Sequence, residues 1–259
     1  VELLQSSWGV RNFEERLKND RKNLADEIVR VIHENVAFQS VTVLDDIHKR
    51  PTLLSTKVPS VVTGNHTAPN NHVLLLIDGI ENESNLHLVD CGTGFPTFRT
   101  ISLNFSEESP IFTDGFLEYK YIRFDGKILR MHGEGDTFKR NNPPIEGLDF
   151  FIGRWRRFYS FDPDHRPRDP HKPADDVYRT VAAGLTTFTS TSPRAVWFPR
   201  KRAVAIANNK LFVENETGEL VTTHLNSDEE ILKAFQEHFP QFKQDTVRRA
   251  LAEWNRVSQ

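Results

Sequence analysis

Two short apolar segments joined by a polar turn are the feature that most restricts how this chain of 259 residues can fold. The segments are Val-Leu-Leu-Leu-Ile at 73–77 and Leu-His-Leu-Val at 86–89, and residues 78–85 between them contain a glycine and several polar side chains. Apolar runs of strand length on either side of a polar segment are typical of a β-hairpin. We therefore predict two antiparallel strands within residues 72–94.

His72 begins the first of these strands and Asp90 follows the second. A register that places residue 75 opposite residue 89 sets the two side chains diagonally across the hairpin. Both then point to the same face, because side chains alternate along a strand with a period of two, whereas a slip of one residue would separate them. The hairpin thus predicts an imidazole beside a carboxylate, which are two of the three groups of a nucleophilic triad.

The remaining pattern predicts helices at both ends and antiparallel strands between them. Apolar residues recur every three or four positions in residues 12–34, which predicts one or two amphipathic helices. Residues 48–71 contain three prolines and many polar residues, and we expect a mostly irregular connection there. Further strands are expected at 38–44, 100–105, 116–124, 127–131, 154–161 and 202–225. Because helices and strands do not alternate, the fold class is α+β.

Turn and cap signals support these assignments. Asp125-Gly126 and Asn208-Asn209 favour tight hairpin turns. Ser227 and Glu230 form a capping box at the start of a C-terminal helix. A last helix is expected to carry three apolar residues on one face, namely Val247, Leu251 and Trp254.

Charge and cysteine content exclude several classes of protein. A net charge of −3 gives no general attraction to nucleic acid or to anionic lipid. The apolar runs are too short to cross a bilayer, and no signal peptide is visible. The single cysteine, Cys91, cannot form an internal disulfide, which favours a reducing compartment. We therefore expect a cytoplasmic protein that binds neither nucleic acid nor membrane.

We interpret two charged segments as parts of the fold rather than as binding sites. Residues 154–157, Arg-Trp-Arg-Arg, are expected to alternate arginine outside with aromatic side chains inside, and residues 199–202 to form a solvated turn that could contact an anion. Histidines and aspartates in 162–176 lack the ligand spacing of a metal site and lie among prolines, so we predict a surface loop and no metal.

Four landmarks occur in a recognisable order along the chain. They are the strand that begins at His72, the Asp-Cys-Gly-Thr-Gly segment at 90–94, the aromatic strand at 155–161, and the Thr-Ser-Pro segment at 189–198 followed by the helix of 224–239. This order resembles the arylamine N-acetyltransferase family over about residues 24–240. These enzymes transfer an acetyl group from acetyl-CoA to an arylamine through a cysteine thioester.

The resemblance implies a fold and a set of site residues. It implies a helical segment at 1–37, a β-barrel-like domain at 38–161 that contains His72 and Asp90, and a C-terminal lid of sheet and helices at 162–259. His72 would be the base and Asp90 the group that orients it. Acetyl-CoA, if the protein is active, would approach four residues, namely Gly92, Gly94, Ser192 and Arg194.

The sequence also departs from the family. The nucleophile of the family lies in an Arg-Gly-Gly-x-Cys motif, and a count back from residue 38 places it near Lys22, where this chain has neither glycine nor cysteine. Arg194, Ala195 and Val196 stand where the family has small hydroxyl residues near the CoA pyrophosphate. Cys91 points to the opposite face from Asp90, and we expect it to be buried and structural. A transglutaminase-like cysteine hydrolase has the same order of cysteine, histidine and aspartate. This chain would lack the cysteine of that enzyme as well.

Two functions remain open. The first is a pseudoenzyme that keeps the fold and a remnant His72–Asp90 pair and acts as a binding or scaffold protein, with a protein partner in that case. The second is an active acetyl-CoA-dependent N-acetyltransferase for arylamines or other small molecules, with a cysteine from outside the sequence given. The missing nucleophile favours the first function.

Overall fold

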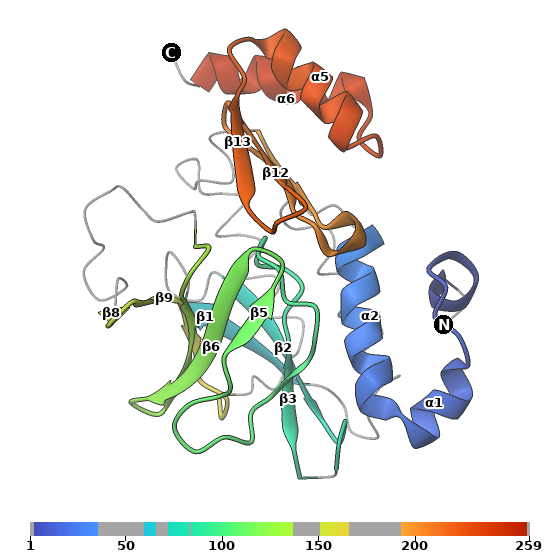
Figure 1. The fold of residues 1–259 in the computed structure, drawn as a ribbon, viewed down its shortest axis with the longest axis vertical. Helices are drawn as coiled ribbons and strands as arrows, with labels where there is room; N and C mark the ends of the chain where they lie inside the picture. The colour runs from blue at the N-terminus through green and yellow to red at the C-terminus, as the bar shows by residue number, and fades with distance from the viewer. Residues whose placement is uncertain are drawn as a thin grey trace.

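The computed structural model describes residues 3–35, 60–65, 72–82, 84–136, 151–165 and 193–257. Three helical segments begin the chain (Figure 1): η1 (Leu3–Ser7), α1 (Phe13–Asn19) and α2 (Arg21–Asn35). The amphipathic pattern at 12–34 therefore forms two helices, which meet at Asp20, a residue with a non-helical backbone. Their buried face includes Phe13, Leu24, Ala25, Ile28, Val29 and Val31.

The strands that follow form one antiparallel sheet in the order β4-β3-β2-β1-β9-β7-β6-β5, with β8 paired to β9. The sheet curls into a half-barrel. Its strands are β1 (Ser60–Asn65), β2 (His72–Asp78), β3 (Leu86–Val89), β4 (Ile101–Ser102), β5 (Phe112–Asp114), β6 (Leu117–Phe124), β7 (Lys127–His132), β8 (Phe151–Ile152) and β9 (Trp155–Phe161).

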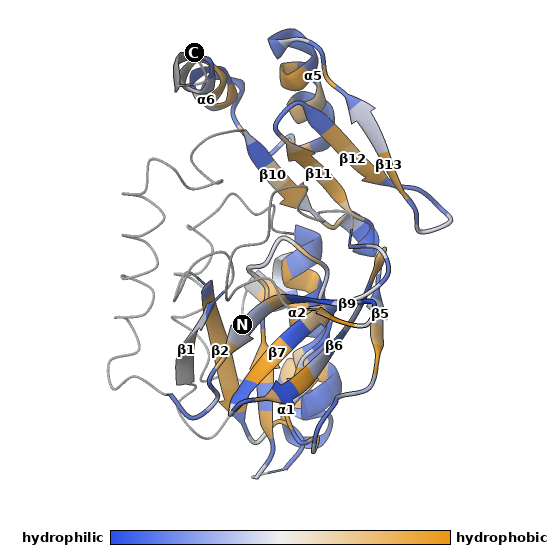
Figure 2. Cartoon of the chain, turned by 90° about the vertical axis from the view of Figure 1, so that its left-hand side faces the viewer, coloured by the Kyte–Doolittle hydropathy of each residue, from blue (hydrophilic) through white to orange (hydrophobic). Residues whose placement is uncertain are grey.

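Strand β2 has both faces buried, which explains its unbroken apolar run. Val73, Leu75 and Ile77 pack with the helices α1 and α2, whereas Leu74 and Leu76 pack inside the half-barrel with the aromatic side chains of β6 and β9. In Figure 2 this strand is coloured as hydrophobic along most of its length. A strand buried on both sides is expected to lose the alternating pattern of a surface strand.

The hairpin register agrees with the prediction. Leu75 pairs with Val89, and Asp78 pairs with Leu86 at the turn. The expectation of an irregular connection at 48–71 is wrong in one part, because residues 60–65 form β1. Gly64 of β1 pairs with His72, and an added Cβ at Gly64 would meet a Leu74 side-chain carbon at 3.3 Å and the Ser160 carbonyl at 3.4 Å. The short strand was missed because its glycine and polar residues resemble a loop.

The expected alternation of arginine outside and aromatic side chains inside at 154–157 is also wrong. Arg156 and Arg157 are 8% and 6% exposed. Arg156 Nε donates to Asp136 Oδ2 at 2.7 Å, and Arg157 Nη1 donates to the carbonyl of Asn65 at 3.0 Å. Each guanidinium is buried because it has a partner distant in sequence.

A second antiparallel sheet and two helices complete the chain. Its strands follow one another in space as in sequence, which confirms the predicted meander. Ser227 Oγ accepts from Glu230 N as predicted, although the Glu230 carboxylate accepts from Asn226 N rather than from Ser227 N. The elements are β10 (Arg194–Trp197), η3 (Pro199–Lys201), β11 (Val204–Ala207), β12 (Lys210–Glu214), β13 (Leu220–His224), α5 (Asp228–His238) and α6 (Gln244–Val257).

The second sheet joins the rest of the molecule at the end of α2 (Figure 1). Trp197 Nε1 donates to the carbonyl of Glu34 at 2.7 Å, and Phe198 N donates to the carbonyl of His33 at 3.3 Å. These bonds occupy carbonyl groups that the end of a helix leaves without an intrahelical partner.

Some expectations fall outside the described residues, namely the strand at 38–44 and the loop at 162–176 beyond residue 165. Among the helices that the structure describes, none is both long and apolar enough to cross a membrane.

Candidate functional site

His72 and Asp90 meet inside the half-barrel, at the open end of the β2–β3 hairpin. His72 Nε2 lies 3.1 Å from Asp90 Oδ1, which also accepts from Gly92 N at 3.4 Å. The Asp90 side chain is 1% exposed and that of His72 is 11% exposed. The predicted contact therefore forms, with the imidazole as its accessible member.

Two further side chains lie against this pair. The His72 ring is 5.2 Å from the Tyr159 ring, centroid to centroid, and Arg130 Nη1 lies 3.6 Å from the second carboxylate oxygen, Asp90 Oδ2. Burial raises the pKa of Asp90, but His72 and the charge of Arg130 lower it more strongly, so that this pKa lies below its usual range. Asp90 is therefore a carboxylate at neutral pH.

This arrangement determines what the imidazole can do. A carboxylate only accepts hydrogen bonds, so the proton shared between the two groups is carried by His72 Nε2. The neutral ring then has its basic lone pair on Nδ1, as a general base requires. The pair can therefore take a proton from a ligand or donate one to it, but it supplies no atom that could hold an acyl group.

Cys91 lies on the opposite side of the sheet. It is 5% exposed and packs in the cluster formed by α1, α2 and the outer face of β2. Burial, followed by the neighbouring Asp90 charge, raises the pKa of its thiol far above the ordinary value. Because a reactive cysteine needs an accessible thiolate, the expectation of a buried structural cysteine is confirmed.

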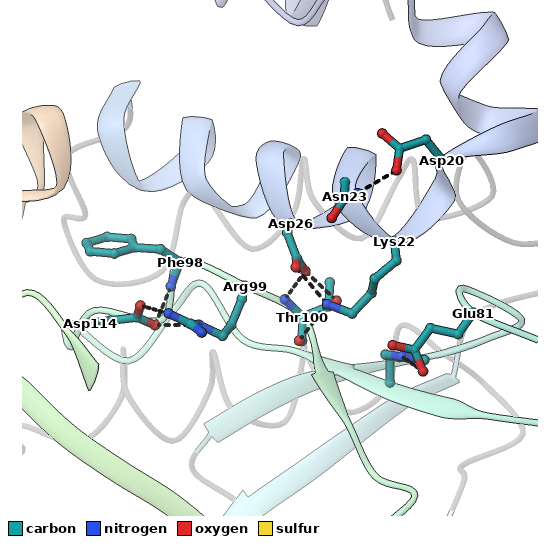
Figure 3. Close-up of polar contacts among 10 residues, drawn as sticks. Asp20, Lys22, Asn23, Asp26, Glu81, Phe98, Arg99, Thr100 and Asp114 are labelled. Atoms are coloured by element: carbon teal, nitrogen blue, oxygen red, sulfur yellow. Dashed lines mark hydrogen bonds and ion pairs between the residues drawn. The ribbon is translucent and has the colours of Figure 1, made fainter. Parts of the chain in front are cut away.

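The position counted for the family's cysteine is also far from His72. Lys22, in the first turn of α2, pairs with Asp26 and donates to the carbonyl of Thr100, as Figure 3 shows. Arg21 donates to the carbonyl of Gly79, at the turn of the hairpin. His72 is seven residues back along β2 from that turn, or roughly 23 Å at the usual rise of a strand. A thiol at position 22 would not reach the imidazole.

The structure describes three of the four residues that were predicted to approach a cofactor. Gly94 has a φ of +72° and lies against β10, where an added Cβ would be 3.7 Å from Val196 Cγ1. Arg194 begins the same strand and donates to Asn208 Oδ1 at 3.4 Å. Gly92 is partly buried beside Asp90, and Ser192 lies outside the described residues. The fold thus brings the 90–94 segment next to β10, while contact with a cofactor stays a prediction.

The structure shows a second buried polar cluster that the sequence did not indicate. Asp136 pairs with Arg156 Nη2 at 2.6 Å and lies 3.8 Å from His132 Nδ1. His132 stacks on Phe158, with 4.2 Å between ring centroids. Burial lowers the pKa of His132 to about 3, so this imidazole is neutral at physiological pH. It neither contacts the His72 ring nor forms a metal site, since the described residues contain no group of three possible metal ligands.

One hollow of the surface lies apart from the pair of His72 and Asp90, which we call the dyad. It has a volume of about 420 Å³ and is lined by the β5–β6 turn, the end of β7 and the β12–β13 turn, with Glu118, Glu134 and Glu219 among its side chains. Because no group of the dyad lines it, this hollow does not determine what His72 can contact.

Arg130 is the site residue that the sequence analysis missed. Its signal was a charged side chain between the apolar residues of 127–131, on the face that β7 shares with Tyr119 and Tyr121 of β6. Its partner Asp90 is 40 positions away in the sequence, and local pattern carries no information on such a contact.

The fold is that of the arylamine N-acetyltransferases. The enzyme of Mycobacterium abscessus superposes with a TM-score of 0.64 over 95% of each chain, at 15% identity. The Mycobacterium marinum enzyme in complex with CoA gives 0.65 over 93% of this chain and 97% of the other, at 12% identity. The Salmonella typhimurium enzyme gives 0.61 over 95% and 98%, at 11% identity. No family model and no curated protein matches the sequence. The predicted resemblance is confirmed at the level of the fold.

Proposed function

We propose that this chain is a pseudoenzyme with the arylamine N-acetyltransferase fold, which binds a ligand at the His72–Asp90 dyad and carries no acyl group on its cysteine. The observation that supports this most directly is the position of Cys91. The only thiol in the sequence is 5% exposed and packs under the helices, on the other side of the sheet from the imidazole. Thioester chemistry needs a thiol within hydrogen-bond reach of its base, about 3 Å.

The ligand of such a protein would contact His72 rather than Asp90, because only the imidazole has accessible surface. CoA or acetyl-CoA is the natural first candidate, since a solved structure of the same fold is a complex with CoA. In this proposal Gly92 and Gly94 allow close approach and Arg194 faces the phosphates, while a contact of Ser192 with the cofactor stays a prediction. A protein partner would be the alternative ligand of the same face, and the cytoplasmic location expected from the single cysteine remains part of the proposal.

The second candidate is an active N-acetyltransferase whose cysteine comes from outside the sequence given. The observation that favours it is the intact dyad, with 3.1 Å between His72 Nε2 and Asp90 Oδ1 and a pKa of Asp90 below its usual range. In that case His72 would take the thiol proton, Asp90 would hold the ring, and the thiolate would carry the acetyl group to an arylamine.

One experiment separates the two candidates. The protein is incubated with acetyl-CoA, its intact mass is measured, and free CoA is followed after addition of an arylamine. We expect no acetyl adduct and no release of CoA above background, together with an increase in melting temperature when CoA or acetyl-CoA binds. An adduct that hydroxylamine removes, or release of CoA that depends on the amine, would overturn the pseudoenzyme proposal.

Two variants make the result specific. Cys91→Ala removes the only thiol of the sequence given, so an adduct that persists in this variant does not lie on Cys91. Its removal by hydroxylamine would then point to a cysteine from outside this sequence. His72→Gln removes the accessible base while it keeps a polar side chain, and we expect it to reduce the shift in melting temperature. A shift that is unchanged in His72→Gln would show that the ligand binds away from the dyad.

A further inference from the structure

We propose that β13 is an interaction surface for a second copy of this chain. The two β13 strands pair edge to edge, in an antiparallel register centred on Thr222 and its copy. The four-stranded sheets of the two molecules then join into one continuous sheet across a twofold axis. The inference goes beyond the proposed function and does not depend on it, because β13 contains no residue of the dyad.

Strand β13 is accessible to a partner. It is the outermost strand of the second sheet (Figure 2), and β12 is its one paired neighbour among the residues that the structure describes. Val221 is 50% exposed, and Thr222, Thr223 and His224 are exposed as well. Because neighbouring side chains of a strand point to opposite faces, these residues include both faces of β13.

The hydrogen bonds to β12 determine which backbone groups of β13 point outward. Leu225 N donates to the carbonyl of Asn209, and Asn215 N donates to the carbonyl of Glu219. Residues that bond across an antiparallel ladder alternate with residues that do not, so the odd-numbered residues of β13 bond to β12. The N–H and C=O groups that point away from β12 therefore belong to Leu220, Thr222 and His224.

One twofold register uses all of these outward groups. With the axis at Thr222, this residue lies opposite its own copy, and Leu220 lies opposite His224 of the second copy. Each of these three pairs exchanges two hydrogen bonds, so the interface contains about six. An axis at Val221 or at Thr223 leaves one outward residue without a partner and gives only about four. Thr222 is therefore the favoured centre.

The side chains of β13 also favour this pairing. Residues 220–224 contain no charged residue other than a histidine and no proline, and the ladder with β12 has no bulge. Charges, prolines and bulges are the usual means by which an edge strand avoids association. In the register centred on Thr222, Val221 lies opposite Thr223 of the second copy, and such β-branched pairs stabilise a sheet. The pairing thus covers the exposed Val221 of both molecules.

A second copy is the partner that these features favour. A partner strand must be extended, free of strong charge and open at its edge, and the β13 of another molecule meets all three conditions. The other strands at the ends of the two sheets, β4, β5 and β10, contain only two, three and four residues. Five residues extend about 17 Å, so we expect an interface of less than standard size and a dimer that forms at high protein concentration.

The first test is sedimentation velocity of the full chain over about a hundredfold range of concentration. We expect the average mass to rise toward that of two chains. Thr222→Lys should weaken this association by about fivefold or more, because like charges would face each other across the axis. Thr222→Glu should do the same. A mixture of the two variants should restore the dimer, because Lys then faces Glu.

Thr246→Lys is the matched control, because it adds the same charge at another exposed threonine, on α6. It should leave the association unchanged. A dimer that Thr222→Lys does not weaken, or that the mixture does not restore, would overturn the inference. A native chain that stays monomeric throughout would also overturn it, and the open edge would then be left to a strand of a different protein.

The native chain provides a second measurement that does not depend on whether the variants fold. Amide hydrogen exchange, followed by NMR at low and high protein concentration, distinguishes the two sides of β13. Exchange of the outward N–H groups of Leu220, Thr222 and His224 should slow as the concentration rises, whereas those of Val221 and Thr223 should be protected throughout. Dimerisation without this slowing would place the interface elsewhere and overturn the inference. No acetyl donor or ligand is used, so a failure here is distinct from a failure of the proposed function.

Discussion

Asp90 and Cys91 are neighbours in sequence, yet the sheet separates their side chains completely. One faces the interior of the half-barrel beside His72, and the other faces α1 and α2. This separation follows from the period of two along a strand and could be predicted from the sequence. The contact between Asp90 and Arg130 could not, because it depends on how β7 is placed across the half-barrel from β3.

Burial of Cys91 gives a prediction for its reactivity. We expect the native thiol to react with Ellman's reagent at least about a hundredfold more slowly than free cysteine, because the reaction requires the thiolate to reach solvent. Denaturant should restore the ordinary rate, and the comparison of the two rates is the measurement. Fast reaction of the native chain would contradict the burial of this thiol and weaken the pseudoenzyme proposal.

Gly135 and Gly218 form a matched pair for a second prediction. Their φ angles are +82° and +83°, but an added Cβ at Gly135 would lie 1.7 Å from the Phe116 carbonyl oxygen, whereas at Gly218 nothing lies within 4 Å. The substitution Gly218→Ala should cost about 1 kcal/mol of unfolding free energy, which is the cost of the left-handed backbone alone. Gly135→Ala should cost at least about 3 kcal/mol, because backbone must also move. Urea unfolding measures both, and equal costs would contradict the close contact at Gly135.

At the scale of elements, Asp26 ties α2 to the segment before β4. Its Oδ1 accepts from Thr100 N and from Thr100 Oγ1, each at 2.7 Å (Figure 3). We expect Asp26→Ala to cost about 2 kcal/mol, because a backbone N–H is left without its acceptor. Asp26→Asn keeps the Oδ1 acceptor and should cost clearly less. Chemical denaturation of the two variants tests this, and equal losses would show that these hydrogen bonds do not stabilise the junction.

The elements themselves divide into those that local pattern determines and those that it does not. The β2–β3 and β6–β7 hairpins and the C-terminal meander combine strand-length runs with turn residues, and their positions could be predicted. Strand β1 could not, since a six-residue strand with a glycine is stabilised mainly by its partners β2 and β9. The burial of Arg156 likewise depends on Asp136, 20 residues earlier.

At the scale of the whole molecule, α2 connects the two sheets. Its apolar face covers the outer side of β2, and the carbonyls at its C-terminal end bond to Trp197 and Phe198. The order of landmarks in the sequence was enough to predict this type of fold, because those landmarks lie on both sheets. The division into segments 1–37, 38–161 and 162–259 stays a prediction.

Two of the fully buried imidazoles, those of His33 and His132, predict that the folded chain loses stability in acid, and burial lowers the pKa of a third, His87, in the same direction. Burial lowers the pKa of His33 to about 4 and that of His132 to about 3, against 6.5 for an exposed histidine. As the pH falls below 6.5, the unfolded chain binds protons that the folded chain does not, so the free energy of unfolding decreases. The loss continues until the pH reaches the folded values. Each histidine should cost roughly 2 kcal/mol at pH 5.

Urea unfolding at pH 7 and pH 5 measures this loss. His33→Phe should reduce the difference between the two conditions, because phenylalanine can keep the edge contacts with Phe98 and Phe198 and binds no proton. His224→Gln, at an exposed position of β13, is the control and should leave the difference unchanged. Asp90 and Asp136 act in the same direction at lower pH, because both have a lowered pKa and lose their ion pairs when they are protonated. Equal stability at pH 7 and pH 5 would mean that the unfolded chain gains no protons relative to the folded one, which contradicts burial of the two rings as neutral imidazoles.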